Sequence, residues 1–497
     1  YLAKIDWNIN DNHRASLTYQ QTEEFRISPY DEGARNVLLS SHYYNIDNIT
    51  KNTSLQLFSD WSTNFSTEFK LSHQTFDQVN GNEVDNPEAI VRTPGGTIYI
   101  GEDDNRHENQ INTERVAASL VGTYYAGDHA IKGGVDYLRH DVFNLYGKTL
   151  HGEYRFNSLD DFEAGNYSNY IVRRPVDGYT EADLAAALVY TQISPFIQDT
   201  WQVNDQLSLT YGVRVNIPSA DRAPPRTPGF EEAFGYRNDY KLGSDNRVIM
   251  PRVSFNYMFD SERFSQLRGG AGVFQSVPPF VWLANPYQNN GVTALQYRSQ
   301  DPASAPFSPD PYNQPIPSGA STELPAYQVD TIDPDFKLPT AWKFTLGYDA
   351  ELPWMGLVGS IDLVDIRAKD AVFYQAINIG QPQGQLRDGR LNFRCLPADG
   401  WFGSAFDSTQ FSGNNCGRNE AFDWRSTKLG NTDKGRSTAI TFSLTKPMSN
   451  GWYGSLSYTF TDAKEVASDG SSQAWSSYQY VSRLNPNEEV LGTATRE

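Results

Sequence analysis

The feature that most constrains this chain is a regular alternation of apolar and polar residues along short segments. Between residues 207 and 214, one parity holds Leu207, Leu209, Tyr211 and Val213, and the other holds Ser208, Thr210, Gly212 and Arg214. Successive side chains of a strand point to opposite faces, so one face of this segment is apolar and the other is polar. The pattern recurs around 252–259, 342–349 and 452–461. Such segments predict strands with one face against an apolar medium and the other against water.

The predicted strands come in pairs with uneven spacing. Short turns rich in Asn, Asp, Ser and Gly predict seven hairpins, over residues 1–20, 54–75, 114–139, 196–216, 252–273, 342–365 and 437–461. Long polar connections separate them, over residues 21–53, 76–113, 141–195, 217–251, 274–341 and 366–436. A stack of β-sandwich domains also has alternating strands, but its turn signals are evenly spaced. Short turns on one side and long loops on the other are typical of outer-membrane barrels.

We therefore predict an all-β fold, a large antiparallel transmembrane β-barrel with long extracellular loops. The low mean hydropathy of −0.57 does not contradict this prediction. A barrel crosses the membrane with alternating segments of about ten residues, which bulk hydropathy does not detect. The sequence contains no continuous apolar run of the roughly 18 residues that a spanning helix needs.

The alternation assigns side chains to the two faces of the predicted barrel. The lipid-facing candidates are Leu207, Leu209, Tyr211, Val213, Trp342, Phe344, Leu346, Leu456 and Tyr458. The lumen-facing candidates are the charged residues Glu68, Lys70, Arg214, Arg252, Lys343, Asp349 and Asp362. The charged residues would either bind a plug and line a transit path, or only hydrate the lumen wall. The sequence does not separate these two roles.

The composition argues against several classes of function. The formal net charge of −19 and the absence of a basic stripe argue against nucleic acid as a partner. Neither a catalytic constellation nor a phosphate-binding loop stands out, so we expect neither an enzyme nor a bound cofactor. The seven histidines are scattered, which argues against a histidine metal site.

Two loop features leave alternatives open. Cys395 and Cys416 would form a disulfide that holds a surface loop in an oxidising compartment, but would remain free thiols in the cytosol. Two acidic clusters offer the oxygen ligands that Ca²⁺ takes, although most such clusters are hydrated loop faces. They are Glu102, Asp103 and Asp104, and Asp333 with Asp335.

Four segments together resemble one known family. The segment FIQDTWQVNDQLSLTYGVRVN resembles the strand–turn–strand signature of TonB-dependent receptor barrels. DNRVIMPRVSFNYMFD and PDFKLPTAWKFTLGYDAE look like the hairpin arms that follow in that family, and the opening YLAKIDWNINDNHRASLTY is similar to its Oar-type, OmpA-related branch. Each motif is short, and the order of the four carries the resemblance over nearly the whole chain.

The resemblance implies a barrel of the 22-stranded type, plugged by an N-terminal domain that is preceded by a segment contacting TonB. We recognise neither part here, so we expect residues 1–497 to be the barrel portion of a longer chain, without the plug and the last strands. It further implies an integral protein of the bacterial outer membrane that performs TonB-dependent active transport of an unknown substrate, with peptide, protein or glycan cargo favoured.

The implied partners are outer-membrane lipid and lipopolysaccharide, and TonB through a segment outside this chain. The Pro-rich stretch 301–319 is expected to be an extended surface loop, which would contact ligand or a surface lipoprotein or serve only as a spacer. Two alternatives remain, a passive outer-membrane porin and a secreted β-sandwich adhesin or glycan-binding protein.

Overall fold

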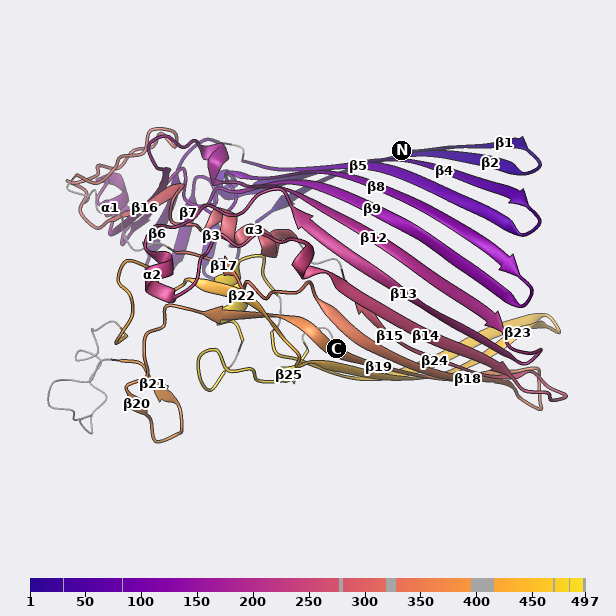
Figure 1. Cartoon of the computed structure of the whole chain (residues 1–497). Helices are drawn as coiled ribbons and strands as arrows, with labels where there is room; N and C mark the ends of the chain where they lie inside the picture. The colour runs from indigo at the N-terminus through magenta and orange to yellow at the C-terminus, as the bar shows by residue number, and fades with distance from the viewer. Residues whose placement is uncertain are drawn as a thin grey trace.

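The computed structural model describes residues 1–497 apart from 30, 83, 277–279, 319–327, 395–414, 468–469, 482 and 495–497. Figure 1 shows one large curved sheet, with short turns at one end and long loops gathered at the other. Among the described residues, no helix has the length and apolar character that crossing a membrane requires.

The large sheet consists mainly of fourteen long strands in chain order, each antiparallel to the next. They are β1 (Leu2–Asn10), β2 (His13–Ser28), β4 (Tyr44–Ser62), β5 (Phe65–Asn82), β8 (Asn109–Ala126), β9 (His129–Tyr146), β12 (Ala186–Gln202), β13 (Leu207–Ala220), β14 (Val248–Met258), β15 (Ser265–Gln275), β18 (Thr340–Glu351), β19 (Val358–Ala376), β23 (Arg436–Ser449) and β24 (Trp452–Glu465). The predicted all-β class and the seven hairpins are confirmed. The β-sandwich alternative is wrong, because the strands form one continuous sheet, and no second sheet of the described chain covers its apolar face.

Local turn chemistry fixes the register of the hairpins. The side chain of Asn10 accepts hydrogen bonds from the backbone N–H groups of Asn12 and His13, both at 2.9 Å. Asn204 closes the β12–β13 turn in the same way. The β23–β24 turn has Asn450 and Gly451 at positive φ, the backbone that a tight two-residue hairpin needs.

The strands extend further toward the loops than the alternation predicts. β2 continues to Ser28 and β4 begins at Tyr44, both inside a predicted connection, and β5, β8, β9, β12 and β19 lengthen similarly. The backbone ladder continues beyond the segments in which apolar and polar residues alternate strictly. The alternation therefore underestimates the length of the strands.

The two outermost long strands of the large sheet, β1 and β24, have edges that are free along most of their length. β1 pairs with β2, and β24 pairs with β23 and with the two-residue β25 (Gly492–Thr493). Among the described residues, no ladder joins β1 to β24. The predicted strand number of 22 and the predicted plug therefore stay predictions.

The long loops form a second, smaller sheet and a set of short elements. In spatial order the small sheet contains β16 (Ala294–Ser299), β11 (Asn169–Pro175), β10 (Glu153–Phe156), β6 (Glu88–Thr93), β7 (Gly96–Ile100) and β3 (Asn36–Leu38). Its aromatic core includes Tyr154, Phe156 and Tyr170. The short elements are η1 (Ser40–His42), α1 (Leu159–Glu163), η2 (Glu181–Leu184), α2 (Phe230–Phe234), η3 (Ser244–Asn246), α3 (Phe280–Gln288), β17 (Thr331–Ile332), β20 (Gly384–Gln385), β21 (Leu391–Asn392), β22 (Thr427–Thr432) and α4 (Ala474–Gln479).

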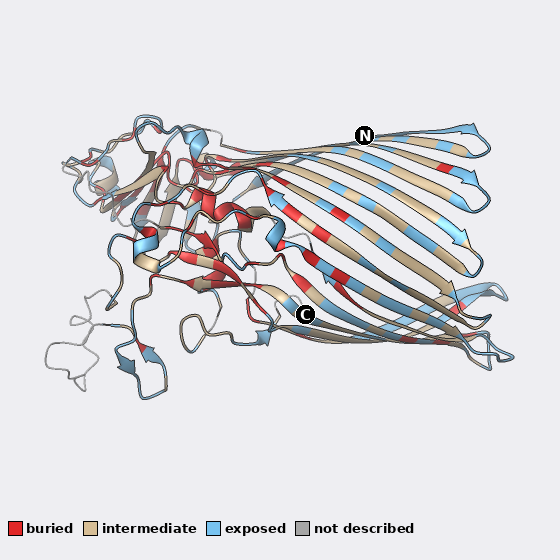
Figure 2. Cartoon of the chain, viewed as in Figure 1, coloured by how far each residue is buried: buried red, intermediate tan, exposed pale blue. Residues whose placement is uncertain are grey.

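The Pro-rich stretch packs on this small sheet, whereas its composition predicts an extended surface loop. The hydroxyl of Tyr154 donates to the side chain of Gln314 at 2.7 Å, and that of Tyr170 donates to the carbonyl of Pro315 at 2.9 Å. Figure 2 shows that buried residues concentrate at the loop end of the molecule. The loops are therefore a packed layer.

Candidate functional site

The two faces of the large sheet are defined by what packs on them. Phe280 of α3 contacts Tyr190 on β12 and His140 on β9. The uninterrupted ladders then place Phe196 and Arg214 on the same face as Tyr190. We call this face, which α3 partly covers, the inner face.

The inner face carries ion pairs along and across its strands. Glu68 pairs with Lys70 on β5, and Arg214 of β13 reaches over β12 to Asp136 of β9. Arg268 of β15 holds two aspartates, with 2.9 Å from Nε to Asp349 and 2.7 Å from Nη2 to Asp362. The two remaining lumen-facing candidates lie on the same face: Arg252 is opposite Gly212 and Gly272, and Lys343 is opposite Gly272 and Ile366.

A glycine makes room for the largest of these networks. Gly347 lies directly between Arg268 and Asp362 in the ladder. A Cβ atom at this position would lie 2.7 Å from both the Arg268 Nη1 and the Asp362 Oδ1. Because real Cβ atoms do not approach that closely, any larger residue at this position would require the guanidinium or the carboxylate to move.

The opposite, outer face presents continuous apolar rows. One row runs across seven strands through Leu207, Tyr257, Leu267, Tyr348, Ile361, Phe442 and Tyr458. The next runs through Leu209, Phe255, Gly269, Leu346, Leu363, Ile440 and Phe460. The register places all nine predicted lipid-facing residues on this face. Seven of them are exposed, namely Tyr211, Val213, Trp342, Phe344, Leu346, Leu456 and Tyr458.

Side chains of the loops share a core with the loop end of the inner face. We call α3, β17, β22 and α4 the outer cap, because their side chains share one core with β12 and β19. β22 also pairs with β19, and β17 pairs with β22, so these two strands extend the large sheet. Leu283, Ile332, Leu429 and Tyr478 are buried there with the wall residue Leu188. The core joins connections that are far apart in the sequence.

One buried carboxylate ties the outer cap together. Asp330 accepts hydrogen bonds from the Thr427 hydroxyl at 2.6 Å, from the Thr427 N–H at 3.2 Å and from the Asn289 side chain at 2.8 Å. Burial raises the pKa of Asp330 to about 6, although these hydrogen bonds act in the opposite direction. No pattern in the sequence marks this residue, because Asn289 lies 41 positions away in the same connection and Thr427 lies in another one.

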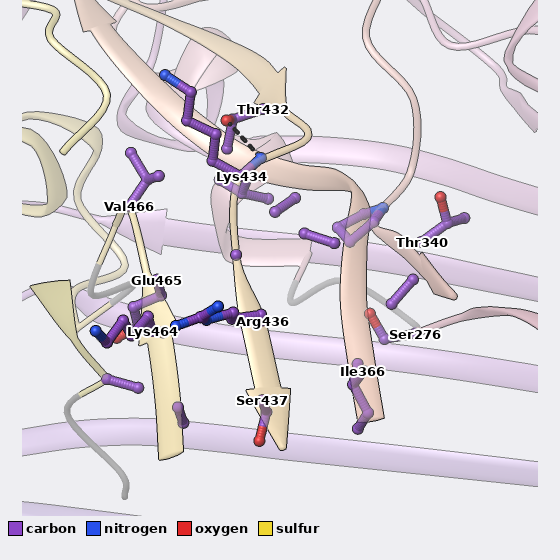
Figure 3. A pocket seen from close by; sticks show the side chains of 18 of the residues that line it. Ser276, Thr340, Ile366, Thr432, Lys434, Arg436, Ser437, Lys464, Glu465 and Val466 are labelled. Carbon is purple, nitrogen blue, oxygen red and sulfur yellow. Dashed lines mark hydrogen bonds between the residues drawn. The ribbon is translucent and has the colours of Figure 1, made fainter. Parts of the chain in front are cut away.

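A cavity of about 500 Å³ lies where β18, β19, β23 and β24 meet the loops (Figure 3). Basic side chains line it, and Arg436 and Lys464 lie opposite each other in the β23–β24 ladder. Lys434 pairs with Glu489 at 2.9 Å. In the described part of the chain, neither Lys343 nor Lys464 forms an ion pair. The lining therefore offers positive charge in an otherwise acidic protein.

The two acidic clusters predicted from the sequence have different environments. Asp333 pairs with Lys428 at 2.7 Å and accepts the Asp335 N–H, so this pair forms a turn with its own counterion. Glu102, Asp103 and Asp104 are buried beside the small sheet. Burial raises the pKa of Asp103, and raises that of Asp104 to about 7.

Two of the histidines that are scattered along the sequence meet in this region. The rings of His107 and His151 stack with 4.5 Å between centroids. Burial alone lowers the pKa of His151, but contacts with Glu102 and Glu108 raise it to about 9. His151 is therefore the counterion of Glu102, with 2.6 Å between Nδ1 and Oε2. Spacing along the chain does not reveal this cluster, because the histidines belong to different loops.

The predicted disulfide remains untested. Cys395 lies outside the described residues, so its pairing with Cys416 stays a prediction.

Comparison with known proteins places the chain in a family. The model of the outer membrane beta barrel domain matches residues 1–493, and the chain belongs to this family. Its fold class and its location as an integral protein of the outer membrane follow from this membership. No protein of curated function matches the sequence.

Two solved structures are similar in fold. The outer membrane transporter YddB from Escherichia coli has a TM-score of 0.56 at 11% identity, over 93% of this chain and 47% of that chain. The FrpB iron transporter from Neisseria meningitidis, F3-3 variant, has a TM-score of 0.50 at 10% identity, over 93% and 52%. This chain spans about half the length of these structures. At such identities the likeness concerns the fold alone.

Proposed function

We propose that this chain forms the barrel wall and outer loops of a TonB-dependent transporter of the Oar-like branch. The observation that carries the proposal is the pairing of a charged inner face with a packed outer cap. An inner face lined by ion pairs suits polar cargo. Loops packed at the outer end of this face argue against free diffusion of solutes along it. Since the outer membrane has no ATP, opening such a barrier would need coupling to TonB.

The proposal also covers the membrane and the cargo. The apolar rows of the outer face would contact lipid, with lipopolysaccharide in the outer leaflet, because only a closed barrel satisfies strand edges in hydrocarbon. The free edges of β1 and β24 would therefore pair with further strands. For cargo we favour peptides or proteins, with glycans as a further class, because the cavity and Lys343 supply positive charge for carboxylates.

Two measurements test the transport mechanism. In planar bilayers, the native protein purified from outer membranes should give no steady conductance; a steady open conductance would support the passive porin. In cells, uptake of fluorescein-labelled casein peptides should saturate and should fall to the level of a strain without the protein when TonB is deleted or a protonophore is added. Uptake that survives both treatments would contradict coupling to TonB.

A matched pair of variants tests the inner face. Lys343→Glu should reduce uptake of acidic labelled peptides several-fold, because it reverses a charge on the inner face. Lys51→Glu makes the same change on the outer face of β4 and should leave uptake unchanged. Equal uptake by both variants would remove the cargo role of Lys343. Absence of labelled-peptide uptake by the unchanged protein would exclude peptides as cargo.

A further inference from the structure

Five carboxylates from three outer loops gather beside the small sheet. Asp31 lies between β2 and β4, and Glu88, Asp103 and Asp104 lie between β5 and β8. Glu153 lies between β9 and β12. Four of them are at least nine-tenths buried: Glu88, Asp103, Asp104 and Glu153, with exposed fractions of 3%, 1%, 5% and 4%. We call these five residues the acidic cluster.

The backbone brings the centre of the acidic cluster together. Glu88 and Glu153 lie directly opposite each other in the parallel β6–β10 ladder. Like charges at such positions repel each other. Ligand oxygens of Glu88, Asp104 and Glu153 nevertheless lie within 4.8 Å of one another. A site of this kind needs positive charge between the carboxylates.

The surrounding cations do not balance the acidic cluster. Lys148 lies 3.4 Å from Asp104, and Arg155 pairs with Glu153 from a half-exposed position. His42 Nδ1 faces the carbonyl of Gly101, while its Nε2 lies 3.2 Å from Asp31 and 3.8 Å from Glu88. The charge of Arg106 also acts on Asp103. Even with His42 counted as charged, four cations face five carboxylates.

One oxygen points to the missing charge independently of the charge count. The Oδ2 atoms of Asp103 and Asp104 are buried and accept no hydrogen bond, but the Lys148 Nζ lies 3.4 Å from the Asp104 Oδ2, so the Asp103 Oδ2 is the one without a close partner. The Asp103 Oδ2 faces into the cluster, 3.9 Å from the His42 Nε2. A buried carboxylate oxygen without a donor is costly, and coordination to a cation satisfies it.

We propose that the acidic cluster binds one Ca²⁺ ion, with Glu88, Asp104 and Glu153 as its central ligands and Asp103 beside them. Several carboxylate oxygens from different loops suit Ca²⁺, which takes six to eight oxygen ligands. Mg²⁺ demands a near-ideal octahedron and retains its water. The neighbouring Glu102–His151 pair neutralises itself and stays outside the site. The bound ion would cross-link two outer loops, and Asp31 with His42 would add a third.

Binding can be measured directly on the full-length protein in detergent after washing with chelator. Equilibrium dialysis with radioactive calcium should give one more bound Ca²⁺ per chain for the unchanged protein than for Glu88→Gln/Asp104→Asn. The matched control is Asp160→Asn, which removes an exposed carboxylate on α1 and should bind as the unchanged protein does. Equal stoichiometry in all three proteins would overturn the proposal.

A spectroscopic titration identifies the cation. The ring of Tyr99 lies 5.1 Å from that of His42, close enough to sensitise Tb³⁺ luminescence from the cluster. Ca²⁺ should displace this Tb³⁺ signal at about 0.1–1 mM, the range of extracellular calcium modules, and Mg²⁺ should displace it far less. Displacement by Zn²⁺ at lower concentration than Ca²⁺ would overturn the assignment of the ion.

Loop stability separates ion binding from simple neutralisation by protons. Ca²⁺ should slow amide exchange in residues 88–108 and 147–156 at least tenfold in the unchanged protein and not in the double variant. Glu153→Gln provides a second variant if the double variant does not fold. If Ca²⁺ protects these residues equally in the unchanged protein and in the variant that folds, the ion binds elsewhere and the proposal fails.

Discussion

Replacing Asp330 tests whether one buried carboxylate holds the outer cap together. Asp330→Ala would leave the N–H and hydroxyl of Thr427 and the amide of Asn289 without their acceptor. Each buried polar group left unpaired costs about 1–3 kcal/mol. Because the Asn289 amide can turn to another partner, we expect cap opening to become easier by about 2–4 kcal/mol.

The raised pKa of Asp330 also predicts how the stability of the outer cap changes with pH. The carboxyl has a pKa of about 6 when buried and 3.8 as its ordinary value, so the folded cap holds a proton more tightly than the opened cap. The cap is therefore most stable below about pH 4, and its stability falls as pH rises toward 6, by about 3 kcal/mol in total. Above pH 6 the curve should flatten. Asp330→Asn removes the ionisation and should show no such fall.

Hydrogen exchange measured by mass spectrometry checks both parts. At pH 7.5, exchange of peptides covering 286–292 and 426–430 should accelerate roughly 30- to 1,000-fold in Asp330→Ala, the factor that 2–4 kcal/mol implies. Peptides from β4 and β5, which lie far from the outer cap, provide the internal control. Unchanged protection of the Thr427 amide against exchange in Asp330→Ala would show that Asp330 does not hold the outer cap together. The same pH slope in Asp330→Asn as in the unchanged protein would refute the ionisation argument.

Three further predictions concern the sheets. Leu363→Arg puts a charge on the outer face, where it should destabilise the folded protein by about 2–4 kcal/mol at mid-membrane and reduce the folded fraction on heat-modifiability gels. Thr345→Arg on the inner face should not reduce that fraction. Equal losses of folded protein in the two variants would contradict the assignment of the faces. Gly347→Val should separate Arg268 from Asp362 and lower the unfolding temperature in detergent. Gly454→Val, with open space around the added side chain, should have little effect. A larger loss in Gly454→Val than in Gly347→Val would contradict a stabilising role of the Arg268 ion pair. Tyr154→Ala should destabilise the small sheet by about 3–5 kcal/mol, seen as protease cleavage within 147–175 while the large sheet stays folded. Resistance to cleavage would show that the aromatic core around Tyr154 contributes little to the stability of the small sheet.

The sequence by itself determined the large sheet. The alternation at Leu207–Arg214 and Trp342–Asp349 specifies two faces, and the polar turns specify hairpins. Both signals are local, because a strand shows its environment at every second residue and a turn needs particular backbone angles. The class of fold, the seven hairpins and the membrane location therefore follow from the order of the amino acids alone.

Only the tertiary structure decided what the loops do. Glu88 meets Glu153, and Asp330 meets Thr427, although each pair is separated by at least 65 positions in the sequence. No periodic pattern marks such residues, because each satisfies a contact with a different loop rather than with a medium. The acidic cluster, the hydrogen bonds of Asp330 and the arginine that crosses Gly347 depend on which segments become neighbours. The alternation of apolar and polar residues indicates which medium each face of the large sheet contacts. The chemistry of the loops depends instead on contacts between segments that are distant in the sequence.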